Sequence, residues 1–475
     1  MPAALRSLAD VPGPPPLPLV GNLLQMDTGR MHRAMEQWSQ RYGDLFCFRV
    51  GRRRILGVAD PTAIGVILRD RPGGYRRTEL LERVFQELGV GGVFAANGAI
   101  WRAQRKMVMA AFDTGHVKTY FSFLTRVTER FYRRLSTYAG RGTGFDLQAE
   151  LMRYTVDVIS GLAFGVDINT IESDGETIQT HLNHVFPMLN RRLSAPFAYW
   201  RWFKLPADRE LDRHLAIVHR EVARLIALAR GRLAADPGLR LEPANLLEAM
   251  IVESEMPGST LTDVDVASNV VTMLLAGEDT TAHTLAWLLY LVTRQPRVVE
   301  RLAVEASAVL AEQPYADRLD RVSQLAYTAA CAHETMRLKP VSPILLLQAI
   351  EPKVVGDVAI PAGTVVATLM RRGSMDKRYF ERPDCFEPDR WLAPGAGSVH
   401  SSRERISMPF GAGPRICPGR NLALLELAMV TSMLFRNFEI RSIGTADGRP
   451  VEEWLAFTMA PSKLRVTLKR RDAVH

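Results

Sequence analysis

The chain has 475 residues, of which 47% are hydrophobic and 23% are charged, and its formal net charge is +9. This composition is ordinary for a globular protein, and the sequence contains no repeat or low-complexity tract. The basic residues are dispersed, and no basic helix carries interleaved aromatic residues. A solvated surface therefore explains the charge better than nucleic-acid binding does.

The four cysteines lie far apart, and no two of them form a CxxC pair. This spacing argues against a zinc ribbon and a thioredoxin-like site, and so sparse a set argues against a secreted disulfide framework. We therefore predict a cytoplasmic protein. The cysteines stand at positions 47, 331, 385 and 417.

The N-terminal segment of residues 11–22 reads VPGPPPLPLVGN and is rich in proline. Its prolines prevent the helix of a signal peptide or of a membrane span. No apolar run in the chain approaches the roughly 20 residues that a spanning helix needs. We therefore expect no transmembrane anchor.

The first predicted elements alternate between helix and strand. Apolar spacing predicts a helix over residues 30–42, which ends at Gly43. Residues 45–50 and 55–58 read as the two strands of a hairpin, and residues 61–70 read as a short helix. The segment 73–98 mixes arginine, glycine and apolar residues without a clear period.

A basic motif, WRAQRK, follows at residues 101–106. Trp101 and Arg105 are four residues apart, so they share one face of a helix. An arginine fork suits a carboxylate, but alone this motif is more typical of an exposed basic helix anchored by one tryptophan. Further helical patterns cover 117–138, 147–164, 178–190 and 209–233, and residues 194–206 form a loop dense in aromatic residues.

The clearest long helix is predicted over residues 261–294, and its middle reads AGEDTT, from Ala276 to Thr281. Gly277 and two adjacent threonines weaken a helix interior. A threonine hydroxyl can also bond the carbonyl one turn back and bend the helix. This motif alone is explained equally well by a helix distortion and by a functional polar patch.

An acid and a base share a helix face in HETMR, at residues 333–337, where Glu334 and Arg337 are three residues apart. Such a pair is commonly a surface ion pair of small energetic value.

The last motif, FGAGPRICPG, spans residues 410–419 and precedes a long apolar helix pattern over 420–435. Its glycines permit a sharp turn and a close approach to a flat object. The turn presents Cys417 near a helix N-terminus, whose dipole favours a thiolate, and a soft thiolate is a candidate iron ligand. A lone cysteine in a turn is more often a buried structural residue.

Together and in this order, the four motifs resemble those of the cytochrome P450 superfamily, the haem-thiolate monooxygenases, in its soluble bacterial-type members. The Cys417 loop matches the family's haem-binding loop at five positions: Phe410, Gly413, Arg415, Cys417 and Gly419. The resemblance implies a mainly α fold with small β-sheets, in one large haem-binding domain over residues 1–475. No linker argues against a single domain, since glycine- and proline-rich stretches such as 393–402 are short.

The resemblance also implies a site. Cys417 would ligate the iron of haem b, and Asp279 and Thr280 would be the catalytic pair. Asp279 would relay protons from solvent, and Thr280 would hydrogen-bond the iron-bound peroxo group and hold a water. The implied haem-binding residues are Cys417, Trp101, Arg105, Ala276, Phe410, Gly411, Arg415 and Gly419, of which Trp101, Arg105 and Arg415 would bind the propionates.

The resemblance also implies an ionic network. Glu334 and Arg337 would form a buried network with Arg390, which holds the cysteine loop in place. Gln348 stands where many members of the family carry a propionate-binding arginine, so this chain departs from the pattern there.

The implied reaction inserts one atom of O2 into a hydrophobic small molecule, by hydroxylation or epoxidation. Electrons would come from NAD(P)H through a separate reductase with a ferredoxin or flavodoxin, docked near Arg102, Lys106 and Arg420. Two alternatives are a peroxide-driven peroxygenase or isomerase of the same fold, whose members lack the acid–alcohol pair, and a haem-binding sensor or carrier without turnover.

The substrate is predicted only by class. The segments that line the family's pocket are mostly apolar here, so we expect a terpenoid, a steroid or an aromatic compound, because burying an unpaired charge is costly. Arg76 and Arg77 are expected near the channel mouth, as solvated surface residues or as a site for a fatty-acid carboxylate. The aromatic loop 194–206 either touches a membrane, gates entry or packs on the protein body.

Overall fold

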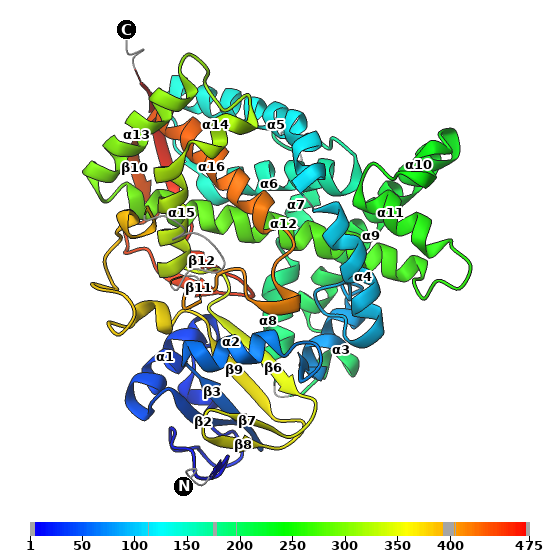
Figure 1. Cartoon of the computed structure of the whole chain (residues 1–475), viewed down its shortest axis with the longest axis vertical. Coiled ribbons are helices and arrows are strands. Elements are labelled where there is room, and N and C mark those ends of the chain that lie inside the picture. The colour runs from blue at the N-terminus through cyan, green and yellow to red at the C-terminus, as the bar shows by residue number, and fades with distance from the viewer. Residues whose placement is uncertain are drawn as a thin grey trace.

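The computed structural model of the chain describes residues 5–112, 114–173, 178–195, 197–392, 403 and 405–471. Most of these residues are helical, and the strands form small sheets in different parts of the molecule (Figure 1). The predicted fold class, mainly α with small β-sheets, is confirmed. The predicted glycine- and proline-rich stretch 393–402 lies outside the described residues.

The helices are α1 (Met31–Tyr42), α2 (Pro61–Arg69), α3 (Glu79–Glu87), α4 (Gly98–Ala111), α5 (Thr114–Arg141), α6 (Leu147–Phe164), α7 (Ile178–Leu182), α8 (Val185–Ser194), α9 (Pro206–Ala235), α10 (Gly238–Leu241), α11 (Leu246–Ser254), α12 (Asp263–Val292), α13 (Pro296–Leu310), α14 (Leu319–Ser323), α15 (Ala326–Leu338) and α16 (Arg420–Asn437). The strands are β1 (Arg6–Ser7), β2 (Leu45–Val50), β3 (Arg53–Val58), β4 (Tyr75–Arg77), β5 (Phe145–Asp146), β6 (Ile344–Ala349), β7 (Lys353–Val355), β8 (Val358–Ile360), β9 (Val365–Leu369), β10 (Phe438–Gly444), β11 (Glu453–Leu455), β12 (Met459–Pro461) and β13 (Arg465–Arg470).

Helix α12 runs through the middle of the helical part and packs against α6, α9, α15 and α16 (Figure 1). It begins at a capping box, in which the Thr262 hydroxyl accepts from the Asp265 backbone N–H at 3.2 Å and the Asp265 carboxylate accepts from the Thr262 N–H at 2.9 Å. Most of its side chains are buried, so packing on several sides stabilises a helix whose middle has weak helix propensity.

The largest sheet has five strands in the order β2-β3-β9-β6-β4, and it lies with α1 and α2 at the end of the molecule near the N-terminus (Figure 1). The predicted hairpin of β2 and β3 is confirmed. The segment 73–98, for which the sequence predicted no element, contains β4 and α3. Strand β4 has three residues and is too short to show a period, whereas Thr78 is a recognisable N-cap for α3, accepting from the Leu81 N–H at 3.3 Å.

Two helix predictions need correction. The predicted helix over 178–190 is two short helices, α7 and α8, which meet at a turn near His184. The predicted helix over 117–138 is longer at both ends, where it forms α5.

The aromatic loop 194–206 divides its side chains between core and surface. Tyr199 and Trp200 are buried, and the Trp200 indole N–H donates to the Glu87 carboxylate at 2.8 Å. Phe197, Trp202 and Phe203 are exposed, Trp202 by 85%. Tyr199 and Trp200 therefore pack on the protein body, which was one of the three roles predicted for this loop. Position 196 lies outside the described residues.

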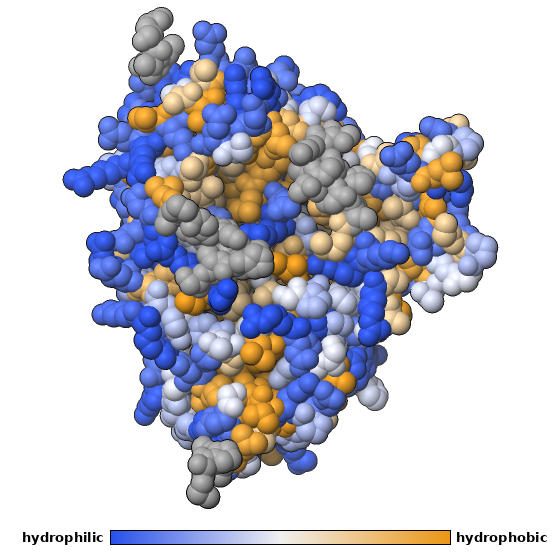
Figure 2. All heavy atoms as spheres, in the orientation of Figure 1, coloured by the Kyte–Doolittle hydropathy of each residue, from blue (hydrophilic) through white to orange (hydrophobic). Residues whose placement is uncertain are grey.

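The face shown in Figure 2 is mostly hydrophilic, and its hydrophobic residues form separate patches. Among the helices of the described residues, none has the length and apolar character needed to cross a membrane.

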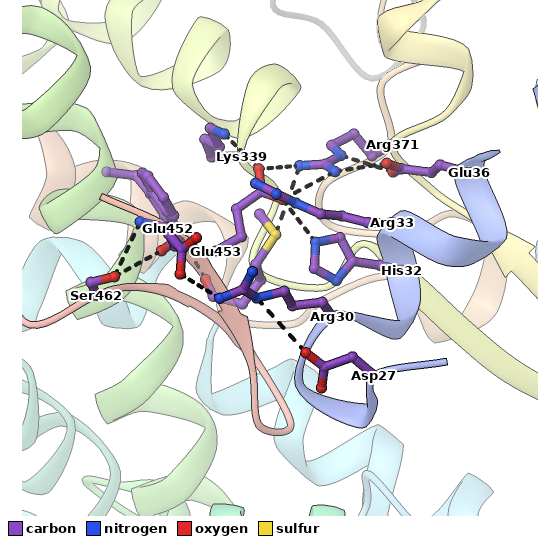
Figure 3. A network of polar contacts seen from close by, with 12 residues as sticks. Asp27, Arg30, His32, Arg33, Glu36, Lys339, Arg371, Glu452, Glu453 and Ser462 are labelled. Carbon is purple, nitrogen blue, oxygen red and sulfur yellow. Dashed lines mark hydrogen bonds and ion pairs between the residues drawn. The ribbon is translucent and has the colours of Figure 1, made fainter. Parts of the chain in front are cut away.

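A buried ionic cluster joins the two ends of the chain (Figure 3). Glu453 in β11 is 3% exposed, and its carboxylate accepts hydrogen bonds from Arg33 of α1 at 2.9 Å, Lys339 at 2.5 Å and Arg371 at 2.7 Å. The ring Nε2 of His32 lies 2.8 Å from the same carboxylate. Burial opposes ionisation of Glu453, but the hydrogen bond with His32 and the charges of Arg371 and Lys339 outweigh it and hold the pKa of this carboxyl well below its usual range.

Glu453→Gln should lower the free energy of unfolding by about 3–5 kcal/mol, because it removes the carboxylate partner of the partly buried Lys339 and one of the two carboxylates that pair with the buried Arg371. Glu452→Gln is the matched control: Glu452 pairs with Arg30 at the half-exposed surface, so its loss should cost less than about 1 kcal/mol. Urea unfolding followed by circular dichroism measures both. Equal effects of the two substitutions would contradict the central place of Glu453.

The contribution of Glu453 should also depend on pH. Its pKa is lowered on folding, so its carboxylate stabilises the folded state above the unfolded pKa of about 4.3, and this stabilisation is lost as the pH falls below that value. The stability difference between the natural protein and Glu453→Gln should therefore shrink by about 1.4 kcal/mol for each pH unit below about 4.3. A difference that stayed constant down to about pH 3 would show that the pKa is not lowered.

Candidate functional site

A cavity of about 440 Å³ lies between α12 and the loop that precedes α16. Residues of α4, α8 and β6 and of the segment 455–458 complete its wall. Segments more than 300 residues apart in sequence thus meet around one space. The site residues predicted from the sequence that line this cavity are Trp101, Arg105, Ala276, Thr280, Phe410, Gly411, Arg415, Cys417 and Gly419. Asp279 was also predicted but does not line the cavity.

The cysteine loop is held by its own backbone. The Cys417 N–H donates to the Phe410 carbonyl at 2.9 Å, which closes the loop. Gly411 and Gly413 have φ of 73° and 71°, in the left-handed region that favours glycine. A Cβ atom at Gly413 would also lie 2.6 Å from the Cα atom of Arg69. The loop therefore packs directly on the end of α2, and this contact fixes the position of Cys417.

The Cys417 side chain lines the cavity, and its exposed surface faces that space. Burial raises the pKa of the thiol, and the Gly419 backbone hydrogen bond and the charges of Arg105 and Arg420 oppose this only in part. The predicted stabilisation of a thiolate by the helix terminus is therefore outweighed by burial. A metal cation bound to the sulfur would reverse this balance, since a coordinating thiol is deprotonated.

Four guanidinium groups, which we call the arginine cluster, converge on the same cavity: Arg71, Arg77, Arg105 and Arg415. Sequence reasoning missed Arg71 and treated Arg77 as a surface residue or a carboxylate site at the channel mouth. Arg77 is buried, its guanidinium lies 4.0 Å from the Phe94 ring centroid, and its Nε donates to the Phe94 carbonyl at 3.2 Å.

The other members of the cluster are held in the same way, by carbonyls and aromatic rings. Arg71 donates to the Leu68 carbonyl at 3.3 Å, and Arg105 donates to the carbonyl of Ile416 in the cysteine loop. Arg415 donates to the Ala96 carbonyl, and its guanidinium lies 4.6 Å from the Trp101 ring centroid. Each guanidinium is thus oriented by neutral groups.

The arginine cluster carries positive charge that no described carboxylate pairs with. Burial, followed by repulsion from neighbouring arginines, lowers the pKa of Arg71 to about 10 and that of Arg415 to about 9, and it lowers the pKa of Arg77 well below its usual range. Nε of Arg415 is buried without a hydrogen-bond partner. Buried charges in proteins are paired, so this arrangement is that of a site for an anionic ligand.

Gln348 and Arg76 point elsewhere. The Gln348 side chain accepts from the Glu79 N–H and donates to the Gly363 carbonyl, both at 3.3 Å, and it is not part of the cavity wall. Arg76 is paired with Glu82. In the β4–β6 ladder Arg77 stands opposite Leu347, next to Gln348, so Arg77 brings a cation into the region where Gln348 provides none.

The AGEDTT motif borders the cavity through Ala276, Gly277 and both threonines. The Thr280 hydroxyl donates to the Ala276 carbonyl at 2.8 Å, as the sequence predicts for a threonine within a helix. A Cβ atom at Gly277 would lie 2.7 Å from Cγ1 of Ile159. The glycine therefore lets α12 pack closely on α6, which is a reason for its presence that the sequence did not reveal.

Asp279 lies behind the cavity wall and is 8% exposed. Its carboxylate accepts from the Thr458 hydroxyl and lies 3.4 Å from Nδ1 of His283. Thr458 lines the cavity, so Asp279 contacts the cavity through the hydroxyl of Thr458. Thr458 is far away in sequence and was missed, whereas the i,i+4 spacing of Asp279 and His283 was visible.

Two more acids are buried, Glu278 within the motif and Glu426 on α16. Burial raises the pKa of Glu278 and of Glu426 well above the usual range, and Glu426 accepts a hydrogen bond from Thr281. Glu426 lines the cavity, and Oε1 of Glu278 has no hydrogen-bond partner. Burial therefore favours the protonated form of both carboxyls, which is the form that can donate a proton. Neither was predicted as a site residue.

The predicted ionic network is buried. The Glu334 carboxylate accepts from Arg337 at 2.8 and 2.9 Å, from Arg390 at 3.0 Å and from the Trp391 indole at 2.8 Å. The side chains of Glu334 and Arg337 are 0% exposed. Arg337 also donates to the carbonyls of Ser374 and Pro383, both at 2.7 Å. The network therefore ties α15 to the irregular segments that precede the cysteine loop.

Comparison with known proteins gives a family. A family model described as Cytochrome P450 matches residues 11–468. The chain is 29% identical to the human 25-hydroxyvitamin D-1 alpha hydroxylase, mitochondrial, over 94% of this chain and 90% of that protein. It is 26% identical to Cytochrome P450 4c21 of Blattella germanica, over 92% and 89%, and 26% identical to Protein LUTEIN DEFICIENT 5, chloroplastic, of Arabidopsis thaliana, over 84% and 68%.

Arg337→Ala should destabilise the protein by about 3–5 kcal/mol, because it leaves Glu334 charged and buried beside one remaining arginine. Arg301→Ala is the matched control, since Arg301 pairs with the exposed Asp389 on the neighbouring surface and should change stability by less than about 1 kcal/mol. Thermal unfolding and the yield of soluble protein measure the effect. A soluble Arg337→Ala protein as stable as Arg301→Ala would show that the network is dispensable.

Proposed function

Because the chain belongs to the cytochrome P450 family and is a haem-thiolate monooxygenase, we propose that Cys417 ligates the iron of haem b in the cavity between α12 and the cysteine loop. The observation that carries this assignment is the convergence of the Cys417 thiol and the arginine cluster on one cavity. The thiol offers the soft donor that haem iron takes, and the arginines offer the charge that two propionates require.

The residues of the cavity fit haem. Arginine guanidinium groups match carboxylates in shape and charge, and an anion among them would replace the missing carboxylate partner of Arg71, Arg77, Arg105 and Arg415. Trp101 lies against Arg415 and orients it. We assign the propionates to this cluster, so that Arg77 and Arg71 join the predicted Arg105 and Arg415.

When bound, thiolate-ligated haem supplies the activation of O2, since the thiolate favours cleavage of the O–O bond. The chain supplies orientation, dryness and protons. Thr280 presents its hydroxyl at the cavity wall, where it holds a water or hydrogen-bonds an oxygen atom. The Asp279 carboxylate passes protons to the cavity through the Thr458 hydroxyl, which is the contact that joins them.

The substrate is a neutral hydrophobic molecule. Apart from the arginine cluster, Glu426, Asn190 and a few hydroxyls, the wall is apolar, with Leu81, Val93, Phe94, Met273 and Phe457 among its residues. A charged substrate would lose its hydration there without a partner. Terpenoids, steroids and aromatic compounds fit this wall. A fatty acid is the competitor, although Arg77 is taken up by the arginine cluster and Arg76 by Glu82. The name of the human relative, a hydroxylase of 25-hydroxyvitamin D, supports hydroxylation as the reaction.

The electron donor is a separate protein, a ferredoxin or flavodoxin reduced from NAD(P)H. Arg102 and Lys106 are exposed on α4, the helix that also carries Arg105, and they offer a basic face to an acidic donor. The cytoplasmic location and the bacterial type remain predictions. Relatives named as mitochondrial or chloroplastic give them no support.

Arg77→Ala should speed the loss of haem by about 10- to 100-fold, because one charge-assisted hydrogen bond contributes about 1.5–3 kcal/mol. Arg76→Ala is the matched control, since the neighbouring Arg76 is paired with Glu82 outside the arginine cluster. Transfer of haem to an excess of an apoprotein acceptor measures the rate. If both variants lost haem at the rate of the natural protein, Arg77 would have no part in holding the cofactor.

Thr280→Ala should keep substrate binding but divert electrons to hydrogen peroxide, because the hydroxyl that orients proton donation is lost. Thr293→Ala removes the same kind of hydroxyl–carbonyl bond near the end of α12 and serves as the control. A surrogate ferredoxin chain allows product, peroxide and NADPH to be counted together. Full coupling of NADPH use to product in Thr280→Ala would leave the hydroxyl with a structural role only.

The relay can be tested through Thr458. Asp279→Asn and Thr458→Val should each slow turnover by about 100-fold or more and enlarge the solvent isotope effect, since each breaks the proton path. Thr458→Ser keeps the hydroxyl and should retain most activity. A fully active Thr458→Val enzyme would show that protons reach the cavity by another path, such as Glu426.

A further inference from the structure

A cluster of metal-ligating side chains lies outside the cavity, where α7, the start of α8 and α9 meet. We call it the His-Glu cluster; its members are His181, His184, Glu210 and His214. The first two belong to α7 and to the turn before α8, and the last two are four residues apart on α9, so they share a face of that helix. Potential metal ligands from the α7–α8 segment therefore lie beside potential metal ligands from α9.

The geometry of the His-Glu cluster is close to that of a bound metal. One ligand atom each from His184, Glu210 and His214 lie within 4.8 Å of one another. Zinc binds imidazole nitrogen and carboxylate oxygen at about 2.0–2.2 Å, so two of its ligand atoms lie at most about 4.4 Å apart. His184 and Glu210 are exposed. Because these two side chains reach the surface, they have room to adjust around an ion.

The fourth member is placed as a supporting residue. His181 is buried, and its Nδ1 lies 2.9 Å from Nδ1 of His214. Metal-ligating histidines usually hydrogen-bond through their other ring nitrogen, and this bond fixes the ring. With Nε2 of His214 on the metal, Nδ1 of His214 is left for His181.

The alternative is a stack of two rings with no metal. The His184 and His214 rings do stack, with centroids 3.8 Å apart and planes at 9°. Stacking gives no role to Glu210, however. Among the described residues, no lysine or arginine forms an ion pair with Glu210, although Arg209 and Arg213 are its neighbours in sequence. Its carboxylate is thus available beside two imidazoles.

We propose that His184, Glu210 and His214 bind one divalent transition-metal ion, with Zn²⁺ as the expected metal and His181 as the residue that positions His214. Two imidazoles and one carboxylate suit Zn²⁺, whereas Ca²⁺ and Mg²⁺ prefer all-oxygen sites. The ion joins the start of α8 to α9. Because Asn190, Leu193 and Ser194 at the other end of α8 line the cavity, the ion also fixes part of the cavity wall.

The test is zinc binding to the tag-free, haem-loaded protein after treatment with a chelator. Isothermal titration with Zn²⁺ and elemental analysis should give one zinc per chain in addition to iron. His214→Ala and the nearly isosteric Glu210→Gln should abolish this binding or weaken it at least tenfold. His181→Ala should weaken it by about 10- to 100-fold, the usual effect of losing a residue that orients a ligand.

His219→Ala is the matched control, because His219 is an exposed histidine of α9 outside the His-Glu cluster. The zinc affinity of this variant should stay within about twofold of that of the natural protein. Zinc should also slow hydrogen exchange in residues 184–215 of the natural protein and not in His214→Ala. Stoichiometric binding that survives in Glu210→Gln and His214→Ala, or no binding by the natural protein, would overturn the proposal.

Discussion

Buried positive charge without an internal counter-ion is the constraint around which this structure is arranged. The arginine cluster gathers four guanidinium groups at one cavity, and burial lowers the pKa values of its members. Such charge is costly in a protein interior unless an anion is present. The cysteine loop, α4 and α12 enclose the same cavity, so the need for an anion and the position of Cys417 define one binding site.

In two other parts of the protein, buried charges are paired with charges of opposite sign. Glu334 is surrounded by Arg337, Arg390 and the Trp391 indole, and Glu453 is surrounded by Arg371, Lys339 and Arg33. In both networks the carboxylate lies at the centre and links segments far apart in the sequence. The arginine cluster differs from these two networks, which contain their own anions. Under our proposal, the cofactor supplies the anion at the cavity.

Short motifs made the fold class and much of the site predictable. The Cys417 loop, the AGEDTT helix and the Glu334–Arg337 pair each lie within a few residues, so their geometry follows from local structure. What sequence reasoning missed depends on long-range contacts. Arg77 reaches the cavity that Cys417 also lines because β4 pairs with β6, and Thr458 contacts Asp279 from another part of the chain. Strand β4 itself was missed because three residues cannot show a period.

The central claim is that Cys417 ligates haem in the cavity that the arginine cluster completes. The most direct measurement is the absorption spectrum of the reduced protein with carbon monoxide, recorded for the natural chain, Cys417→Ala and Cys385→Ser, which changes an exposed cysteine elsewhere. The natural protein and Cys385→Ser should show the strongly red-shifted Soret band of thiolate-ligated haem, and Cys417→Ala should lack it. A red-shifted band that persists in Cys417→Ala would contradict the account.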